Sequence, residues 1–238
     1  MLSVRDIISN SITQIRSNLP VMSCFWAMFA AGSYIFLRLN AMSQVFFPIY
    51  LATLYFFSYF FFRVYFNQRP ILDWDNLGRA LVKMIVIVLL AFFSVMVFKI
   101  CFMLMYLFAK SLSIFPGLYN FLAYVYHSAV ITFLSLICFF AISLVTVFIP
   151  TFAWLELICG KESSITFTFI ELKGRYLQLL SCFLIIFIAL PLFVNLLLAV
   201  LGFSIIPFIV VASAMGVFQM VAYAETYKIL FAFSPFVK

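Results

Sequence analysis

Long stretches without charge alternate with short polar segments along this chain, and the alternation predicts its secondary structure. No Asp, Glu, Lys or Arg occurs in 17–37, 44–62 or 176–224. About 20 apolar residues span a ~30 Å hydrocarbon core as a helix, and a helix bonds its own backbone groups in lipid. Strands of a membrane barrel would alternate polar and apolar residues, whereas these runs are apolar on every face. The pattern therefore predicts an all-α membrane protein.

We predict about six transmembrane helices in a single polytopic domain that covers 1–238. The predicted spans are 19–37, 45–62, 84–108, 128–149, 177–201 and 205–224. The third and fourth are the hardest to bound, because 111–155 contains no charged residue and a single histidine, His127. We interpret 111–127 as an apolar external loop and leave open whether it re-enters the membrane. Pro150 is expected to bend or end the fourth span and to leave Trp154 as an interfacial anchor.

Amphipathic segments precede the first, third and fifth predicted spans. They begin near residues 4, 73 and 163, where apolar residues recur at helical spacing between polar ones. In the last segment, Ser163 or Ser164 can cap a helix that we expect to continue through Gly174 into the fifth span. Segments of this kind lie in the headgroup region of a bilayer. We therefore expect all three to lie on the cytoplasmic surface.

The distribution of Lys and Arg predicts the orientation. Eleven of the fourteen fall in the N-terminal segment, in the loops after the second and fourth spans, or after the sixth span. Only Arg38 and Lys110 fall on the opposite side, and Lys99 lies within the third span. Basic residues are retained on the cytoplasmic side of a membrane. Both termini are therefore predicted to be cytoplasmic, which requires an even number of spans.

Composition excludes several other classes of protein. A hydrophobic content of 68%, only 9% charged residues and a mean hydropathy of +1.26 exclude a soluble domain. The net charge of +7 is explained by the basic loops, so no nucleic-acid partner is expected. The five cysteines are scattered without metal-ligand spacing, and no disulfide framework is expected. The N-terminal segment is too long and too patterned for a cleavable signal.

Three stretches together resemble a known family in their layout. They are "VRDIISNSITQIRSNLPVMSCFW", "VYFNQRPILDWDNLGRALVKM" and "FIPTFAWLELICGKESSITFTFIELKGRYLQLLSCFLIIF". Their order resembles the YciC-like bacterial inner-membrane proteins, which are related to the membrane domain of some glycerophosphodiester phosphodiesterases. Phe169 and Ile170 stand where that pattern has a more polar Leu-Arg-Ser-like stretch. The resemblance implies a six-helix fold in the bacterial inner membrane, and it implies no catalytic residues.

Basic residues beside the spans are candidates for contact with anionic lipid headgroups. A Lys or Arg near an anionic surface contributes about 1 kcal/mol to membrane association. The candidates in the cytoplasmic segments are Arg16, Arg79, Lys83, Lys173 and Arg175. Arg63, which follows an aromatic-rich span, is interpreted as a further headgroup anchor.

Polar residues within the spans are the remaining candidates. Lys99 is a functional candidate by default, although its long stem also lets it reach the interface. Asn195 and Gln219 are expected to hydrogen-bond neighbouring helices, and Pro191 would free a carbonyl that can accept such a bond. Glu225 and Lys228 are spaced for an ion pair at the end of the last span. His127 alone does not form a metal site.

No enzyme motif occurs in the sequence. There is no H-E-x-x-H, no nucleophile elbow and no G-x-x-x-x-G-K-[ST], so we expect no catalytic residues and no cofactor. The favoured hypothesis is a non-enzymatic inner-membrane protein that contacts anionic lipids, or a subunit of an envelope assembly with a membrane-protein partner or a second copy. The alternative is a small-solute transporter or channel, with helix breaks at Pro48, Pro191 and Pro207.

Overall fold

The computed structural model describes residues 3–38, 43–69, 71–111, 138, 141–161, 164–202 and 204–231. Every element in these ranges is a helix, as the hydrophobic pattern predicted. The elements are α1 (Val4–Ser17), α2 (Leu19–Arg38), α3 (Ser43–Tyr65), α4 (Trp74–Ser111), η3 (Leu144–Phe148), α7 (Ile149–Ile158), α8 (Ile165–Glu171), α9 (Tyr176–Cys182), η4 (Phe183–Ala189), α10 (Leu190–Val200) and α11 (Ile205–Phe231). His127 and the predicted loop 111–127 fall almost wholly outside the described residues, as does most of 128–140.

Within the described ranges, five helices are long and apolar enough to cross a membrane. They are Leu19–Phe36, Trp74–Phe98, Ala141–Ile158, Tyr176–Val200 and Ile205–Phe231. The predicted span 45–62 lies inside the 23-residue helix α3, which is not one of these five. By length and composition these five helices are compatible with an integral membrane protein. The predicted spans 19–37, 84–108, 177–201 and 205–224 correspond to four of them, whereas the predicted span 128–149 overlaps Ala141–Ile158 only from residue 141 on and otherwise lies almost wholly outside the described residues.

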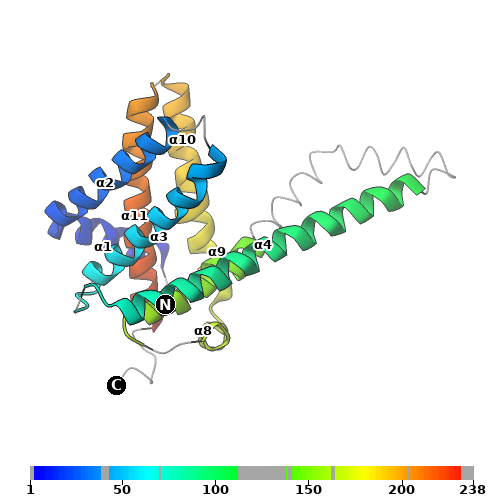
Figure 1. Ribbon diagram of the computed structural model, residues 1–238, viewed down its shortest axis with the longest axis horizontal. Coiled ribbons are helices and arrows are strands. Elements are labelled where there is room, and N and C mark those ends of the chain that lie inside the picture. The colour runs from blue at the N-terminus through cyan, green and yellow to red at the C-terminus, as the bar shows by residue number, and fades with distance from the viewer. Residues whose placement is uncertain are drawn as a thin grey trace.

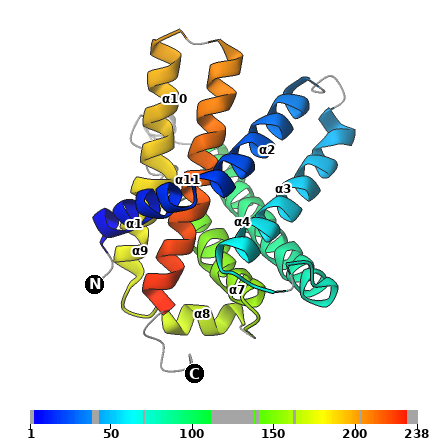
Figure 2. The same ribbon diagram turned by 90° about the vertical axis from the view of Figure 1, so that its left-hand side faces the viewer.

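The helices diverge from one end of the molecule. α10 and α11 run side by side, α2 lies against α11, and α3 lies next to α2 (Figures 1 and 2). α4 leaves in another direction as a long arm (Figure 1). The start of α4, the end of α11, α7 and α8 all lie toward the end of the molecule from which the helices diverge (Figures 1 and 2).

α1 is an amphipathic helix, but protein covers its apolar side. Ile7 is fully buried, and Val4, Ile8 and Ile15 pack against the core. The elements that α1 contacts are α11 and α2. The backbone N–H of Asn18 donates to Gln14 O at the end of α1, and α2 begins one residue later. The predicted amphipathic segment therefore exists, and most of its apolar face packs against protein, while Ile12 is 41% exposed.

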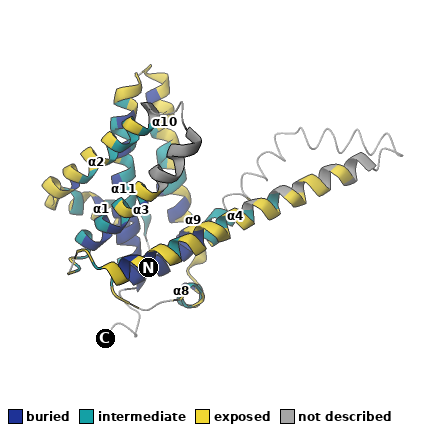
Figure 3. Cartoon of the chain, viewed as in Figure 1, coloured by how far each residue is buried: buried dark blue, intermediate teal, exposed yellow. Residues whose placement is uncertain are grey.

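α4 combines two elements that we predicted as separate segments. The amphipathic segment that begins near residue 73 and the predicted span 84–108 form one helix of 38 residues, about 57 Å long at 1.5 Å per residue. Asp73 caps its start, since its Oδ1 accepts the Asn76 backbone N–H at 3.1 Å. Beyond the first turns most described side chains of α4 are exposed (Figure 3).

Pro150, which the sequence predicted to bend or end the fourth span, does not end it. The π-helical turn η3 precedes it, and α7 continues to Ile158 with Pro150 in its first turn. A proline lacks the N–H that a continuing helix needs, and the wider π turn accommodates that gap. The hydroxyl of Tyr223 on α11 donates to Phe148 O at 2.9 Å. Trp154, in the same helix α7, is only 1% exposed, so it does not lie at the membrane interface as predicted.

The helix predicted to run through Gly174 is broken there. Gly174 has a φ of +85°, a left-handed conformation that favours glycine. α8 ends at Glu171, and α9 starts at Tyr176. The predicted cap is present, because Ser164 Oγ accepts the Phe167 backbone N–H at 3.0 Å.

Aromatic rings fill the centre of the molecule. Phe152 stacks on Tyr223 with ring centroids 4.5 Å apart, and Phe148 meets Tyr223 edge-on at 5.1 Å. Phe183 and Phe187 contact Phe148 at 5.0 and 4.9 Å. Aromatic pairs at these distances stabilise beyond the area that they bury. The rings thus hold η3, α7, η4 and α11 together.

Candidate functional site

Polar side chains from five helices and the turn after α8 meet at the point where the helices diverge. We call this region the basic junction. It consists of the end of α3, the start of α4, the end of α7, α8 with the turn that follows it, and the end of α11. Side chains join these parts across long sequence separations, as in the contact of Arg63 with Ile158. The segments predicted to lie on the cytoplasmic side are therefore neighbours in space.

The carbonyl groups of α7 accept donors from two other helices. Arg63 Nη1 donates to Ile158 O at 3.0 Å, and Lys83 Nζ donates to Ala153 O at 3.2 Å. Ile158 O is one of the last carbonyls of α7, which have no partner within the helix and carry partial negative charge, so the Arg63 cation is stabilising there. Arg63 is only 3% exposed. The interpretation of Arg63 as a headgroup anchor is therefore wrong, because Arg63 binds the end of α7 inside the protein.

Asn76 links α3, α4 and α7. Its Nδ2 donates to Leu157 O at 2.7 Å, and its Oδ1 accepts the Tyr59 hydroxyl at 3.1 Å. Tyr55 adds a bond from its hydroxyl to Leu77 O at 2.9 Å. Asn76 is buried, so these bonds form away from water. Together they fix the direction in which α4 leaves the junction.

Glu225 and Lys228 form the predicted ion pair. Lys228 Nζ lies 2.8 Å from Glu225 Oε1. The hydroxyl of Tyr65 on α3 donates to the same carboxylate oxygen, and Lys228 Nζ lies 4.4 Å from the Tyr65 ring centroid. Glu225 is buried and Lys228 is partly exposed. The pair thus joins the ends of α3 and α11.

Cys159 lies at the end of α7 among these charges. Burial raises the pKa of its thiol to about 12, and the negative charge of Glu156 acts in the same direction. Lys161, Arg63 and Lys228 oppose that change. A thiol with so high a pKa is protonated at neutral pH, so Cys159 has no nucleophilic character there.

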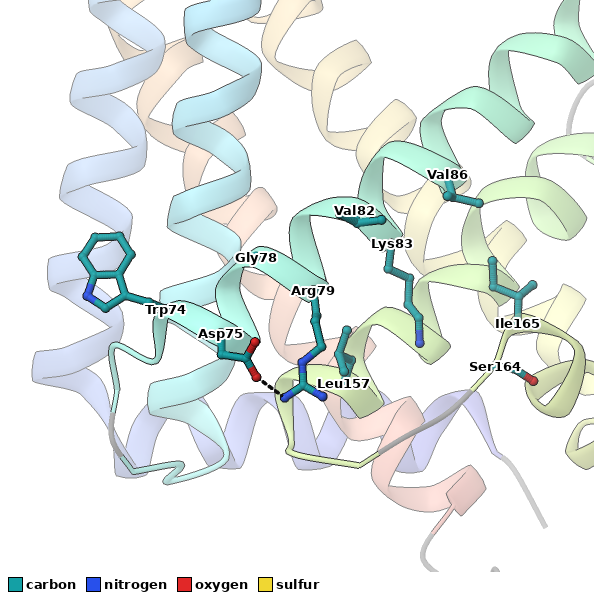
Figure 4. A pocket seen from close by; sticks show the side chains of 10 residues that line it. All are labelled: Trp74, Asp75, Gly78, Arg79, Val82, Lys83, Val86, Leu157, Ser164 and Ile165. Atoms are coloured by element: carbon teal, nitrogen blue, oxygen red, sulfur yellow. Dashed lines mark ion pairs between the residues drawn. The ribbon is translucent and has the colours of Figure 1, made fainter.

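A groove of about 950 Å³ opens on the outer side of the basic junction (Figure 4). Its charged side chains are Arg79, Lys83 and Asp75, and Arg79 Nη2 lies 2.8 Å from Asp75 Oδ2. Arg79 and Lys83 point from α4 toward α7 (Figure 4). Apolar residues complete the walls, and the lining comprises Trp74, Asp75, Gly78, Arg79, Val82, Lys83, Val86, Leu157, Ser164 and Ile165. The groove thus places two cations beside an apolar surface.

The structure brings together some of the predicted lipid-contact residues. Arg79 and Lys83 share the groove, and Lys83 is partly buried by its bond to α7. Arg175 and Lys173 belong to the turn between α8 and α9, where the Nη1 of Arg175 donates to Leu230 O at 3.0 Å. Arg16 is exposed near the end of α1. Contact of these residues with lipid stays a prediction.

The three polar candidates within the spans have separate positions. Gln219 Nε2 points to Ile186 O at 3.4 Å and to Phe187 O at 3.5 Å, so the expected bond between helices is present but long. Phe187 O and Ile186 O lie four and five residues before Pro191, which has no N–H to donate to either carbonyl, and the π turn η4 bonds residues five apart. Asn195 is exposed on α10 and makes no hydrogen bond to any residue that the structure describes. The side chain of Lys99 lies outside the described part of the structure.

Sequence reasoning missed the buried members of the junction. Glu156 and Asn76 are 5% and 3% exposed, although each stands beside residues that read as a polar loop. Their signal was weak, since a polar residue at the end of an apolar run is usually solvated. No group of three metal-ligating side chains occurs among the residues whose positions are described.

Comparisons of the chain with protein-family models, with curated proteins and with solved structures found no match.

Proposed function

We propose that this chain is a non-enzymatic, multi-pass inner-membrane protein whose basic junction lies at the anionic headgroups of the cytoplasmic leaflet. In this proposal α3 and the 128–149 segment complete six spans, and both termini are cytoplasmic. The proposal includes membership of the YciC-like layout and a bacterial inner-membrane location. It also leaves room for a membrane-protein partner or a second copy.

The proposal rests on one observation: basic side chains from segments distant in sequence lie close together in the structure. Arg63, Lys83 and Arg175 each reach a helix other than their own, and all of these contacts are in the junction. Exposed cations remain outside these contacts, since Lys173 lies in the turn after α8 and Arg16 lies near the end of α1. A surface of this kind is attracted to anionic lipid at about 1 kcal/mol per cation, while exposed apolar helices remain in the hydrocarbon.

The aromatic centre favours this function over transport. Solute sites in transporters lie near the midplane and use polar groups at helix breaks. Here the break at Pro191 is followed by an outward-facing Asn195, and the carbonyl of Phe187 has Gln219 as its donor. Rings of Phe148, Phe152 and Tyr223 occupy the space between the helices. A small-solute transporter or channel therefore stays the second candidate.

Lipid association of the full chain tests the proposal. The double variant Arg16→Glu with Lys173→Glu reverses the charge of two exposed residues. Their side chains make no hydrogen bond in the described structure. Removing two favourable contacts of about 1 kcal/mol each should lower enrichment of phosphatidylglycerol in the purified protein at least tenfold. Arg38→Glu, on the side predicted to be external, is the matched control. Equal enrichment in both variants, or a reporter fused to the C-terminus that reads as external, would contradict the proposal.

A further inference from the structure

Two parallel stripes of side chains run along the first three turns of α4. Residues four apart lie on one face of a helix. The apolar stripe consists of Trp74, Gly78, Val82 and Val86, and the charged stripe consists of Asp75, Arg79 and Lys83. Both line the groove of Figure 4. The groove therefore presents a charged row and an apolar row side by side on α4, opposite Leu157 and Ile165, as one phospholipid requires.

A second hollow lies farther along α4, away from the junction. It has a volume of about 630 Å³, and its surface is almost wholly apolar. It starts at Leu90, one turn beyond Val86, and extends to Val97 and Cys101 between α4 and residues 141–146. From Val82 to Val97 the helix rises about 22 Å, against ~15 Å for half of a hydrocarbon core. An acyl chain that starts at the groove therefore has an apolar track of sufficient length.

We propose that this groove binds one glycerophospholipid, with the phosphate between Arg79 and Lys83 and an acyl chain along Val82 and Val86 toward Leu90. The site deepens the proposed function, since it rests on the junction lying at headgroup depth. Arg79 offers a planar set of donors to phosphate oxygens, and Lys83 adds a compact charge. Asp75, 80% exposed at its side chain, accepts from the ammonium or hydroxyl of a headgroup.

Gly78 leaves room for the ligand. Glycine within a helix costs stability relative to alanine. A Cβ built at Gly78 would meet no atom within 4 Å, so packing within the chain does not require glycine there. The open space lies inside the groove, next to Arg79 and Val82. A bulky side chain at this position should occupy the groove without disturbing the helix.

Native mass spectrometry of the full chain, exchanged into detergent with phosphatidylglycerol or phosphatidylethanolamine, tests the site. Wild type should retain one phospholipid per chain. Each lost cation should weaken retention about fivefold, so Arg79→Gln with Lys83→Gln should weaken it about 30-fold. Gly78→Phe should lower it at least tenfold. Gly32→Phe, at an equally open glycine in α2, is the matched control and should retain the lipid.

The outcomes separate the site from the general proposal. Loss of the single lipid in Gly78→Phe, with bulk phosphatidylglycerol enrichment kept, supports the site. Arg79→Gln with Lys83→Gln should lose the single lipid and also lower bulk enrichment, because both residues are cations of the junction. If the groove retains phosphatidylethanolamine in preference, the Asp75 carboxylate accepts from its ammonium. If it retains phosphatidylglycerol in preference, the carboxylate accepts from the glycerol hydroxyls. If Gly78→Phe retains the single lipid as wild type does, and circular dichroism shows that the variant is folded, the site is overturned. If bulk phosphatidylglycerol enrichment is also kept, the proposed function is unaffected by that result. Loss of bulk enrichment in Arg16→Glu with Lys173→Glu counts for the proposed function alone.

Discussion

Replacing Asn76 by alanine should loosen the basic junction more than any neighbouring change at the surface. The substitution removes the donor to Leu157 O at 2.7 Å and the acceptor of the Tyr59 hydroxyl at 3.1 Å. A hydrogen bond contributes about 0.5–1.5 kcal/mol net, and a buried group left without its partner costs about 1–3 kcal/mol. Alanine is the better helix former, so helix propensity does not explain a loss.

The two partners decide where in that range the cost falls. Leu157 O also accepts the Gly160 N–H at 3.0 Å, and the Tyr59 hydroxyl also reaches Asp73 O at 3.4 Å. Neither group loses every bond, so we expect Asn76→Ala to cost about 2 kcal/mol. For a chain of this size that lowers the unfolding midpoint by roughly 4–8 °C.

Thermal unfolding in detergent micelles, followed by circular dichroism, provides the measurement. Asp75→Ala is the control, because an exposed ion pair contributes at most about 1 kcal/mol. Tyr59→Phe removes the hydroxyl that Asn76 accepts, so a double-mutant cycle should show a coupling of about 1 kcal/mol between the two residues. Strict additivity, or a cost for Asn76→Ala no larger than that of Asp75→Ala, would refute the reasoning.

Three further predictions follow from the described contacts. Phe152→Ala should cost about 3–5 kcal/mol of unfolding free energy, since the lost transfer free energy of the ring adds to a cavity cost of ~24 cal/mol per Å³; an unchanged midpoint would exclude a packed aromatic centre. In a variant that keeps Cys159 as its sole cysteine, maleimide labelling at pH 8 should be about a thousandfold slower than for a thiol of pKa 9, and its rate should rise with pH up to about 12. Fast labelling at pH 8 would show that the thiol is not buried. Gln219→Leu should cost only about 0.6 kcal/mol, because its bonds of 3.4–3.5 Å are long; a loss above 2 kcal/mol would require a stronger contact.

The spans were predictable because they depend on composition alone. An apolar run of the right length forms a helix in lipid whatever it later packs against. Helix ends depend on particular backbone conformations instead. The π turn before Pro150 and the left-handed Gly174 are choices that hydrophobicity does not record.

The candidate site was predictable only in part, for a similar reason. Arg79 and Lys83 could be selected because basic residues beside a span are common headgroup ligands. That they share one groove depends on the direction of α4, which Asn76 and Tyr59 fix through bonds to residues distant in sequence. Arg63 has the same sequence context as Arg79, and only its distance from α7 separates a buried cation from an exposed one.

The bond between Arg63 and Ile158 also has a consequence for biosynthesis. The two residues are 95 positions apart. At 5–20 residues per second, a ribosome needs roughly 5–20 s to supply Ile158 after Arg63 has emerged. During that interval the guanidinium must stay in water or among phosphates, since its native acceptor does not yet exist. Assembly of this end of the protein is therefore a late event that follows insertion of the earlier helices.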